Sequence, residues 1–213
     1  MKNVTILAAF ATLLLPLSSA YAHTAYGPQL EGFDYPHPVE SFTFTSQQQP
    51  LSMAYMDVPP TTEANGRTAV LLHGKNFCGA TWQDTIEVLS AEGYRVIAPD
   101  QIGFCRSSKP RGYQFSFNQL AHNTHALLAD LNIDKITLIG HSMGGMLAAR
   151  FTLNHPEQVE QLVLANPIGL EDWQQAGVPY ATIDQMYQGQ LQTSYEGIKN
   201  YQLKFYYNGQ WKP

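Results

Sequence analysis

Short, uninterrupted apolar runs alternate along the chain with stretches in which apolar residues recur at helical spacing. The apolar runs lie at residues 69–72, 96–98, 136–139 and 162–165. The helical stretches lie at residues 82–93, 116–131 and 142–154. Strands that are apolar on both faces and alternate with helices are typical of a parallel sheet covered on both sides. The pattern therefore predicts the α/β class, with a mostly parallel sheet and helices on both faces.

Two segments outside this alternation predict additional structure. Residues 39–45 and 51–58 alternate between apolar and polar positions, which predicts an antiparallel strand pair at one edge of the sheet. Residues 169–213 are rich in aromatic side chains and contain no clear strand, so we expect the start of a mostly helical cap over the core. We therefore expect a leader, the N-terminal part of an α/β core, and the start of a cap or lid, at residues 1–22, 23–168 and 169–213.

The N-terminus has the pattern of a secretory signal peptide. Lys2 precedes an apolar stretch at residues 4–17, and Ala20 and Ala22 provide small residues at the end of the segment. This pattern predicts cleavage after Ala22 and a periplasmic or secreted mature protein. The alternative is a membrane anchor, but the apolar run is shorter than the ~20 residues that a membrane span needs. We therefore expect no stable membrane anchor.

Composition narrows the classes of partner. The chain has 213 residues, of which 44% are hydrophobic and 14% are charged, and this balance is typical of a globular protein. The formal net charge is −5 and no basic run occurs, so we expect no binding to nucleic acid. The sequence contains no metal-binding cluster and no phosphate-binding loop, so we expect no cofactor. The oligomeric state is left open.

The sharpest motif is Gly-His-Ser-Met-Gly at residues 140–144, directly after one apolar run and directly before a helical stretch. That context is what a nucleophile elbow requires, because the chain must turn sharply from strand to helix and thereby exposes the serine hydroxyl. Gly140 and Gly144 lack side chains that would collide across such a turn. We therefore predict that Ser142 is the catalytic nucleophile. The alternative is a glycine-rich turn with an incidental serine.

A nucleophilic serine needs nearby donors for the developing oxyanion. We expect the backbone N–H of Met143 to be one donor and the backbone N–H of Lys75, in the loop after the first apolar run, to be the second. The side chain of Asn76 is a further candidate. His73 and His141 are interpreted as structural residues, His73 pinning its loop by hydrogen bonds and His141 buried in the core.

The segments HGKNFCGATW, APDQIGFCRSSKP, GHSMGG and HPEQVEQLVLANP together resemble the α/β-hydrolase superfamily. The similar branch carries a serine nucleophile and a cap, and it includes esterases, haloperoxidase-like esterases, proline iminopeptidases and carbon–carbon bond hydrolases. The resemblance implies the roles given above for Ser142, Met143 and Lys75. Dehalogenases and epoxide hydrolases of this superfamily carry aspartate at the elbow, so serine disfavours those chemistries here. Asp100 is a candidate for the catalytic acid, but the preferred interpretation is that Asp100 and Arg106 brace a turn beside the site.

Two departures from the family pattern affect the interpretation. Cys105 stands where the family usually has glycine. The family also places its catalytic acid and histidine after the nucleophile, on the last strands of the sheet. Only His155 follows Ser142, in a position typical of a surface residue, and Asp172 is a fallback site for the acid. We therefore expect an incomplete chain that lacks the catalytic histidine, with an unpaired strand at one edge of the sheet.

The chain contains two cysteines, Cys78 and Cys105. The resemblance implies that their loops follow adjacent strands, and export would place them in an oxidising compartment. A disulfide bridge and two free thiols are both open interpretations of this pair.

The function predicted from these features is a secreted serine hydrolase that cleaves an ester or similar acyl bond through an acyl-enzyme. The expected substrate is a small hydrophobic acyl compound, and Trp173, Tyr180 and Tyr187 are candidates to line its pocket, although each could instead belong to the core of the cap. Amide or carbon–carbon bond cleavage and acyl transfer are alternatives within the fold. A non-catalytic or truncated protein of the same fold is the alternative outside it.

Overall fold

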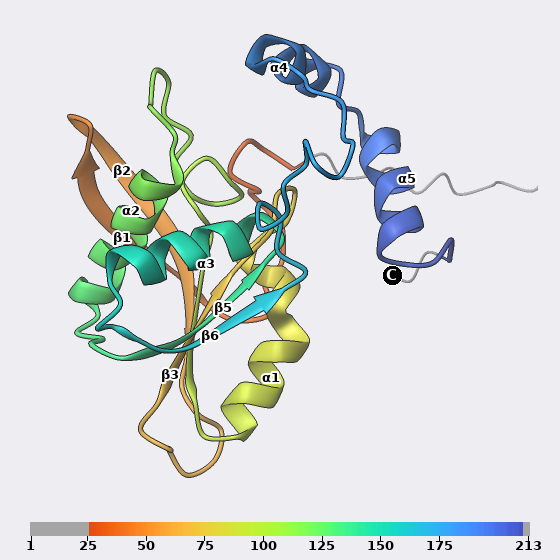
Figure 1. Cartoon of the computed structure of the whole chain (residues 1–213). Coiled ribbons are helices and arrows are strands. Elements are labelled where there is room, and N and C mark those ends of the chain that lie inside the picture. The colour runs from red at the N-terminus through yellow and green to blue at the C-terminus, as the bar shows by residue number, and fades with distance from the viewer. Residues whose placement is uncertain (1–25, 211–213) are drawn as a thin grey trace, which may run out of the picture.

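The computed structural model describes residues 26–210 as an α/β core with two cap helices beside it (Figure 1). The predicted leader and its cleavage site after Ala22 lie outside the described residues. A six-stranded sheet has the order β1-β2-β4-β3-β5-β6. Its strands are β1 (Val39–Ser46), β2 (Gln49–Val58), β3 (Thr68–Leu72), β4 (Arg95–Pro99), β5 (Ile136–His141) and β6 (Val159–Ala165).

The pairing of the strands follows the hydrophobic pattern of the sequence. β1 and β2 pair antiparallel at one edge, and β2 also pairs antiparallel with β4. The strands β4, β3, β5 and β6 are parallel to one another. The predicted α/β class, the parallel sheet and the antiparallel edge pair are therefore confirmed.

Helices cover both faces of the sheet, and each face has its own apolar cluster. The helices α2 (Phe117–Asp130) and α3 (Met143–Asn154) pack on one face, where Leu127, Leu147 and Phe151 join residues of β3 and β5 in one buried cluster. The 3-10 helix η1 (Gly79–Trp82) and helix α1 (Gln83–Ala91) cover the other face, where Ile86 belongs to the second cluster. Figure 1 shows α1 on the opposite side of the sheet from α2 and α3.

The edge strand β6 departs from the buried pattern that its apolar sequence predicts. Leu162 and Val163 remain 37% and 45% exposed, whereas the other three parallel strands are largely buried. The reason is position, because no described strand pairs with the outer edge of β6. This matches the unpaired strand expected at one edge of the sheet.

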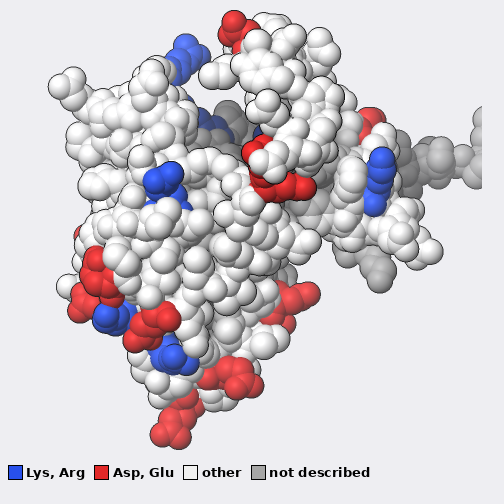
Figure 2. Space-filling view, in the orientation of Figure 1, with Lys and Arg blue, Asp and Glu red and all other residues white. Residues whose placement is uncertain are grey.

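The cap segment is helical, as predicted, and it packs less tightly than the core. It contains α4 (Ile183–Leu191) and α5 (Tyr195–Phe205), and neither helix has a fully buried residue. Figure 1 shows both helices beyond the carboxyl ends of the parallel strands. The face seen in Figure 2 carries scattered charges of both signs and is mostly uncharged. Among the described residues, the helices are too short or too polar to cross a lipid bilayer.

Candidate active site

Ser142 lies at the corner between β5 and α3 with a backbone conformation that non-glycine residues rarely adopt. Its φ is 54° and its ψ is −116°. Hydrogen bonds hold this conformation from several directions: its N–H donates to the carbonyl of Ala165 at 3.2 Å, and its carbonyl accepts from the N–H groups of Gly145 and Ile168 at 3.0 and 3.3 Å. Such strain costs about 1–3 kcal/mol and persists only where the surroundings enforce it. The predicted elbow geometry is therefore present.

The glycines around Ser142 allow β5, α3 and β3 to approach one another closely. A Cβ atom at Gly140 would lie 2.2 Å from the carbonyl oxygen of Gly144. A Cβ atom at Gly144 would lie 2.1 Å from the carbonyl oxygen of Leu72. Both distances are shorter than any real contact of this kind, so no side chain can be accommodated at either position without displacing the backbone.

Two backbone segments with amide groups lie next to Ser142. Met143 is the first residue of α3, so its N–H has no partner within the helix and belongs to the positive end of the helix dipole. The loop that contains Lys75 follows β3, and a Cβ atom at Gly74 would lie 3.1 Å from the Cβ atom of Ser142. The structure thus brings together the three residues predicted as nucleophile and oxyanion donors, Ser142, Met143 and Lys75.

His73 fixes the start of this loop through both ring nitrogens. Its Nδ1 lies 2.9 Å from the carbonyl oxygen of Gly74, and its Nε2 accepts a hydrogen bond of 3.0 Å from the N–H of Gln101. Because a carbonyl can only accept, Nδ1 carries the proton and the ring is neutral. Burial lowers the pKa of His73, which agrees with a neutral ring. The structural interpretation of His73 is confirmed.

Asp100 and Arg106 brace the neighbouring loop, as predicted, although not as a side-chain ion pair. The buried carboxylate of Asp100 accepts from the N–H of Gly79 at 2.7 Å, from the N–H of Arg106 at 3.1 Å and from the hydroxyl of Tyr35 at 2.5 Å. The Arg106 guanidinium instead donates to the carbonyl of Phe33 at 2.6 Å and stacks 4.5 Å from the centre of the Tyr35 ring.

The two cysteines form a disulfide between these loops. Cys78 and Cys105 are bonded to each other, with their Cα atoms 5.9 Å apart, so the structure favours the bridge over free thiols. Their sulfurs and the Asp100 carboxylate lie within 4.8 Å of one another, which is close enough for a shared metal ion. In this oxidised form the sulfurs are bonded to each other, and the carboxylate accepts three hydrogen bonds. The cluster therefore serves as a covalent brace.

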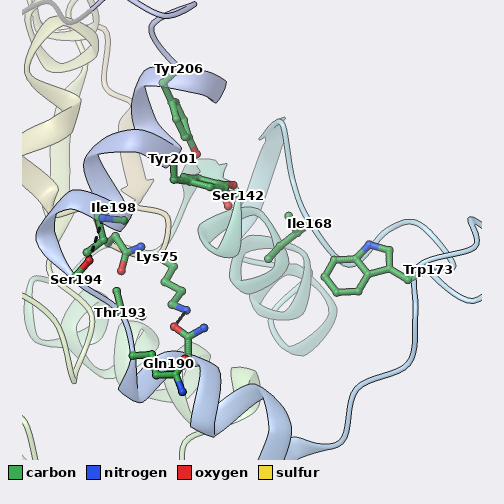
Figure 3. Close-up of a pocket in the computed structure, with 13 residues that line it drawn as sticks. Lys75, Ser142, Ile168, Trp173, Gln190, Thr193, Ser194, Ile198, Tyr201 and Tyr206 are labelled. Atoms are coloured by element: carbon green, nitrogen blue, oxygen red, sulfur yellow. Dashed lines mark hydrogen bonds between the residues drawn. The ribbon is translucent and has the colours of Figure 1, made fainter.

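A cavity of about 520 Å³ opens between Ser142, the Lys75 loop and the cap (Figure 3). Trp173 lines it, as predicted for a substrate-binding residue. Tyr180 and Tyr187 do not line it. Tyr180 is 89% exposed in the segment before α4, and Tyr187 lies on the exposed surface of α4. For these two residues the predicted placement in this cavity is wrong, because Tyr180 precedes α4 and is almost fully exposed, and Tyr187 is on a solvent-exposed part of α4.

Other side chains form the apolar lining that was expected from these tyrosines. Ile168, Ile198, Tyr201 and Tyr206 line the cavity at Ser142 (Figure 3). Ile198 and Tyr201 are three positions apart on α5 and therefore share one helical face. That spacing was visible in the sequence, but which face of α5 turns toward Ser142 depends on the tertiary structure.

His141 is not the buried core residue that we expected. It is only partly buried, and its ring packs edge-on against Phe77 at 5.7 Å and Tyr206 at 5.7 Å. Phe77 and Tyr206 also contact each other, with ring centres 5.3 Å apart. These three rings connect the end of α5 to the core beside Ser142. Burial lowers the pKa of His141.

No described histidine forms a hydrogen bond with Ser142. His155 follows the last residue of α3, at the opposite end from Ser142, and stacks on His125 with ring centres 4.0 Å apart. It is partly buried by this stacking, although a surface position was expected. The carboxylate of Asp172 accepts hydrogen bonds from the N–H groups of Gln174 and Gln175 at 3.0 and 3.1 Å, which caps a local turn. The structure thus places neither candidate as a partner of Ser142.

Comparisons with known proteins agree with this architecture. A solved structure described as a "probable hydrolytic enzyme" from Pseudomonas aeruginosa PAO1 is 62% identical, with a TM-score of 0.83 over 88% of this chain and 60% of that one. A haloalkane dehalogenase of Mycolicibacterium paratuberculosis is 33% identical over 62% of this chain and 44% of its own length. A 2-hydroxy-6-oxo-2,4-heptadienoate hydrolase of Pseudomonas putida is 32% identical over 49% and 39%. The chain therefore spans less than two thirds of the length of each of these relatives.

The family assignment has support that is independent of any single relative. A family model described as the alpha/beta hydrolase fold matches residues 69–209, which include the corner at Ser142, the loop that contains Lys75 and both cap helices. The chain belongs to the α/β-hydrolase fold family.

Proposed function

We propose that the protein is a serine hydrolase that cleaves an ester or similar acyl bond through an acyl-enzyme. The observation that carries this proposal is the strained corner at Ser142, which faces a cavity and has backbone amides beside it. In the proposed reaction, Ser142 Oγ attacks the carbonyl carbon and the N–H groups of Met143 and Lys75 stabilise the oxyanion. The leaving group departs, and water then hydrolyses the acyl-serine.

The side chains around the cavity support a small or medium apolar acyl group as the substrate. Trp173, Tyr201, Tyr206 and Ile168 provide aromatic and aliphatic surface next to Ser142. Polar side chains such as Asn76 and Gln192 also line the cavity, and pockets for small organic ligands typically combine apolar surface with polar groups that orient the ligand. Aspartate, the nucleophile of dehalogenases in this superfamily, does not stand at the elbow, so we do not extend the dehalogenase activity of the Mycolicibacterium relative to this chain.

We propose further that the general base is an imidazole that this sequence does not contain. Two observations support this proposal besides the greater length of the relatives. No described imidazole hydrogen-bonds Ser142, and a serine without a base is a weak nucleophile. The outer edge of β6 also leaves Leu162 and Val163 exposed, as expected where a further strand would pair.

A fluorophosphonate probe, with and without added imidazole, tests both parts. We expect slow labelling of the chain that becomes faster when imidazole in solution takes the role of the missing base. Ser142→Ala should abolish the labelling, and Ser41→Ala, at an exposed serine on β1, should not change it. Labelling that survives in Ser142→Ala would overturn the proposed nucleophile. Fast labelling without imidazole would place a base within this chain and overturn the second part.

A folded protein whose Ser142 never reacts, even with imidazole, would instead support a non-catalytic binding role of this fold. Circular dichroism of the same sample checks the fold in that case. This outcome would favour the alternative that the sequence leaves open.

We also propose that the protein is exported to the periplasm or beyond. The leader pattern supports export, and the Cys78–Cys105 bridge agrees with an oxidising compartment. The intact mass of protein purified from an exporting host tests this, since cleavage after Ala22 leaves His23 as the first residue. A mass that includes the leader would contradict the proposal.

A further inference from the structure

The cavity at Ser142 has a single charged side chain in its lining, that of Lys75. All other lining residues are uncharged, and several are aromatic or aliphatic. Lys75 is an exposed residue, so its ammonium can attract a ligand of opposite charge without a large cost of desolvation.

The ammonium is held in place by the cap. Lys75 Nζ donates a hydrogen bond to the side-chain oxygen of Gln190 on α4, so the Lys75 side chain extends from the core loop toward the cap helix (Figure 3). Gln190 is neutral and leaves the positive charge uncompensated. The ion pairs of the described residues do not include Lys75. An ammonium has three donors, so donors remain for a ligand beyond the one that Gln190 uses.

The position of this charge relative to Ser142 indicates which part of a substrate it would contact. The Lys75 backbone belongs to the loop beside Ser142, whereas its ammonium lies at α4. A group bound there is therefore separated from the carbonyl that Ser142 would attack. A single ammonium can balance one negative charge, which favours a carboxylate over a phosphate dianion.

We propose that the Lys75 ammonium, positioned by Gln190, selects acyl substrates that carry a carboxylate on the part of the molecule directed toward α4. This inference rests on the proposed hydrolase function, of which it specifies the substrate class. Lys75 then has two separate roles, because its backbone N–H faces the oxyanion and its side chain recognises the far end of the substrate.

Binding of two matched esters, followed by NMR titration, tests the proposal without requiring turnover. The probes are monomethyl adipate, which carries one carboxylate, and dimethyl adipate, which is neutral. The titrations use the Ser142→Ala chain so that neither ester is consumed. We expect the monoester to bind up to about fivefold more tightly, as for an exposed ion pair. The preference should shrink at high salt.

Substitutions then assign the preference to one side chain. Lys75→Met and Lys75→Gln keep the backbone N–H and should remove most of this preference, whereas Lys75→Arg should retain it. Lys109→Met, at a lysine that does not line this cavity, is the matched control and should leave the preference unchanged. Gln190→Leu should weaken the preference while dimethyl adipate still binds.

The outcomes separate this inference from the proposed function. Equal binding of the two esters, or a preference that survives Lys75→Met, would overturn the role of the ammonium even if Ser142 reacts with the fluorophosphonate. The opposite combination is also informative: the protein prefers the carboxylate, this preference depends on Lys75, and Ser142 never reacts. That result would support anion recognition and overturn only the hydrolase proposal.

Discussion

The carboxylate of Asp100 accepts a hydrogen bond of 2.7 Å from the backbone N–H of Gly79. This bond connects the loop after β4 to the start of η1, the helical turn that follows the Lys75 loop. The same carboxylate also receives the Arg106 N–H and the Tyr35 hydroxyl, so one side chain joins three segments that are far apart in the sequence. The wall of the proposed site thus depends on a buried acceptor, the Asp100 carboxylate.

Asp100→Asn tests this dependence. Asparagine offers one oxygen and turns an NH₂ group toward donors that need an acceptor, so buried hydrogen bonds are lost. We expect a loss of about 2–4 kcal/mol in the free energy of unfolding, measured by urea denaturation. Asp130→Asn, at an exposed position on α2, should change stability by no more than about 0.5 kcal/mol. Equal effects of the two substitutions would argue against the role of Asp100.

The disulfide should contribute to stability independently of Asp100. Cys78 and Cys105 are 27 positions apart, and closing a loop of that size stabilises a protein by about 3–4 kcal/mol in the chain-entropy view. The double substitution Cys78→Ala with Cys105→Ala should therefore lower the urea midpoint. Adding a reductant should lower the midpoint of the wild-type protein and leave that of the double variant unchanged. The four samples are the wild-type protein and the double variant, each with and without reductant. The same urea midpoint in all four would contradict this prediction.

Stability should fall when the solution becomes acidic. Burial lowers the pKa of His73, His141 and His155, and for His155 the nearby His125 adds to the effect. The unfolded chain then binds protons at a higher pH than the folded chain does. The stabilisation is fully present above the unfolded pKa of about 6.5 and is lost as the pH falls toward the lower folded values.

Thermal unfolding between about pH 8 and pH 5 measures this effect. His155→Gln removes one of the three groups and should make the fall in melting temperature shallower. A melting temperature that rises as the pH is lowered through 6.5 would contradict the predicted direction.

Gly144→Ala should disrupt the corner at Ser142. The added Cβ would lie 2.1 Å from the Leu72 carbonyl oxygen, so β3 and α3 must separate. We expect a destabilisation of about 3 kcal/mol and loss of Ser142 labelling by the fluorophosphonate. Gly189→Ala is the matched control, because nothing lies within 4 Å of its added Cβ and alanine favours the helix α4. Similar losses in both variants would show that the effect is not specific to the elbow.

The sequence predicts the core well because its signals are local or periodic. Runs that are apolar on both faces identify the buried parallel strands, and the motif around Ser142 requires a strand before it and a helix after it. β6 shows the limit of this reasoning, since its run is equally apolar yet its position at the edge leaves Leu162 exposed. The hydrophobic pattern of a strand shows that both of its faces are suited to burial. Its position in the sheet decides whether those faces are actually covered.

The lining of the cavity was harder to predict because it depends on how separate elements meet. The cap tyrosines at positions 180, 187, 201 and 206 are equally plausible pocket residues in the sequence. Of these four, only Tyr201 and Tyr206 line the cavity at Ser142. The disulfide could not be decided from the spacing of its cysteines, because bridging depends on the distance between their Cα atoms. The contact between Lys75 and Gln190 likewise joins positions 115 residues apart.

The Cys78–Cys105 bridge encloses η1, α1 and β4 within one covalent ring. A protease that cuts any single peptide bond inside this ring would leave two pieces that still migrate together on a gel. Only a reducing agent would release them, so a nicked molecule would pass for an intact one under non-reducing conditions.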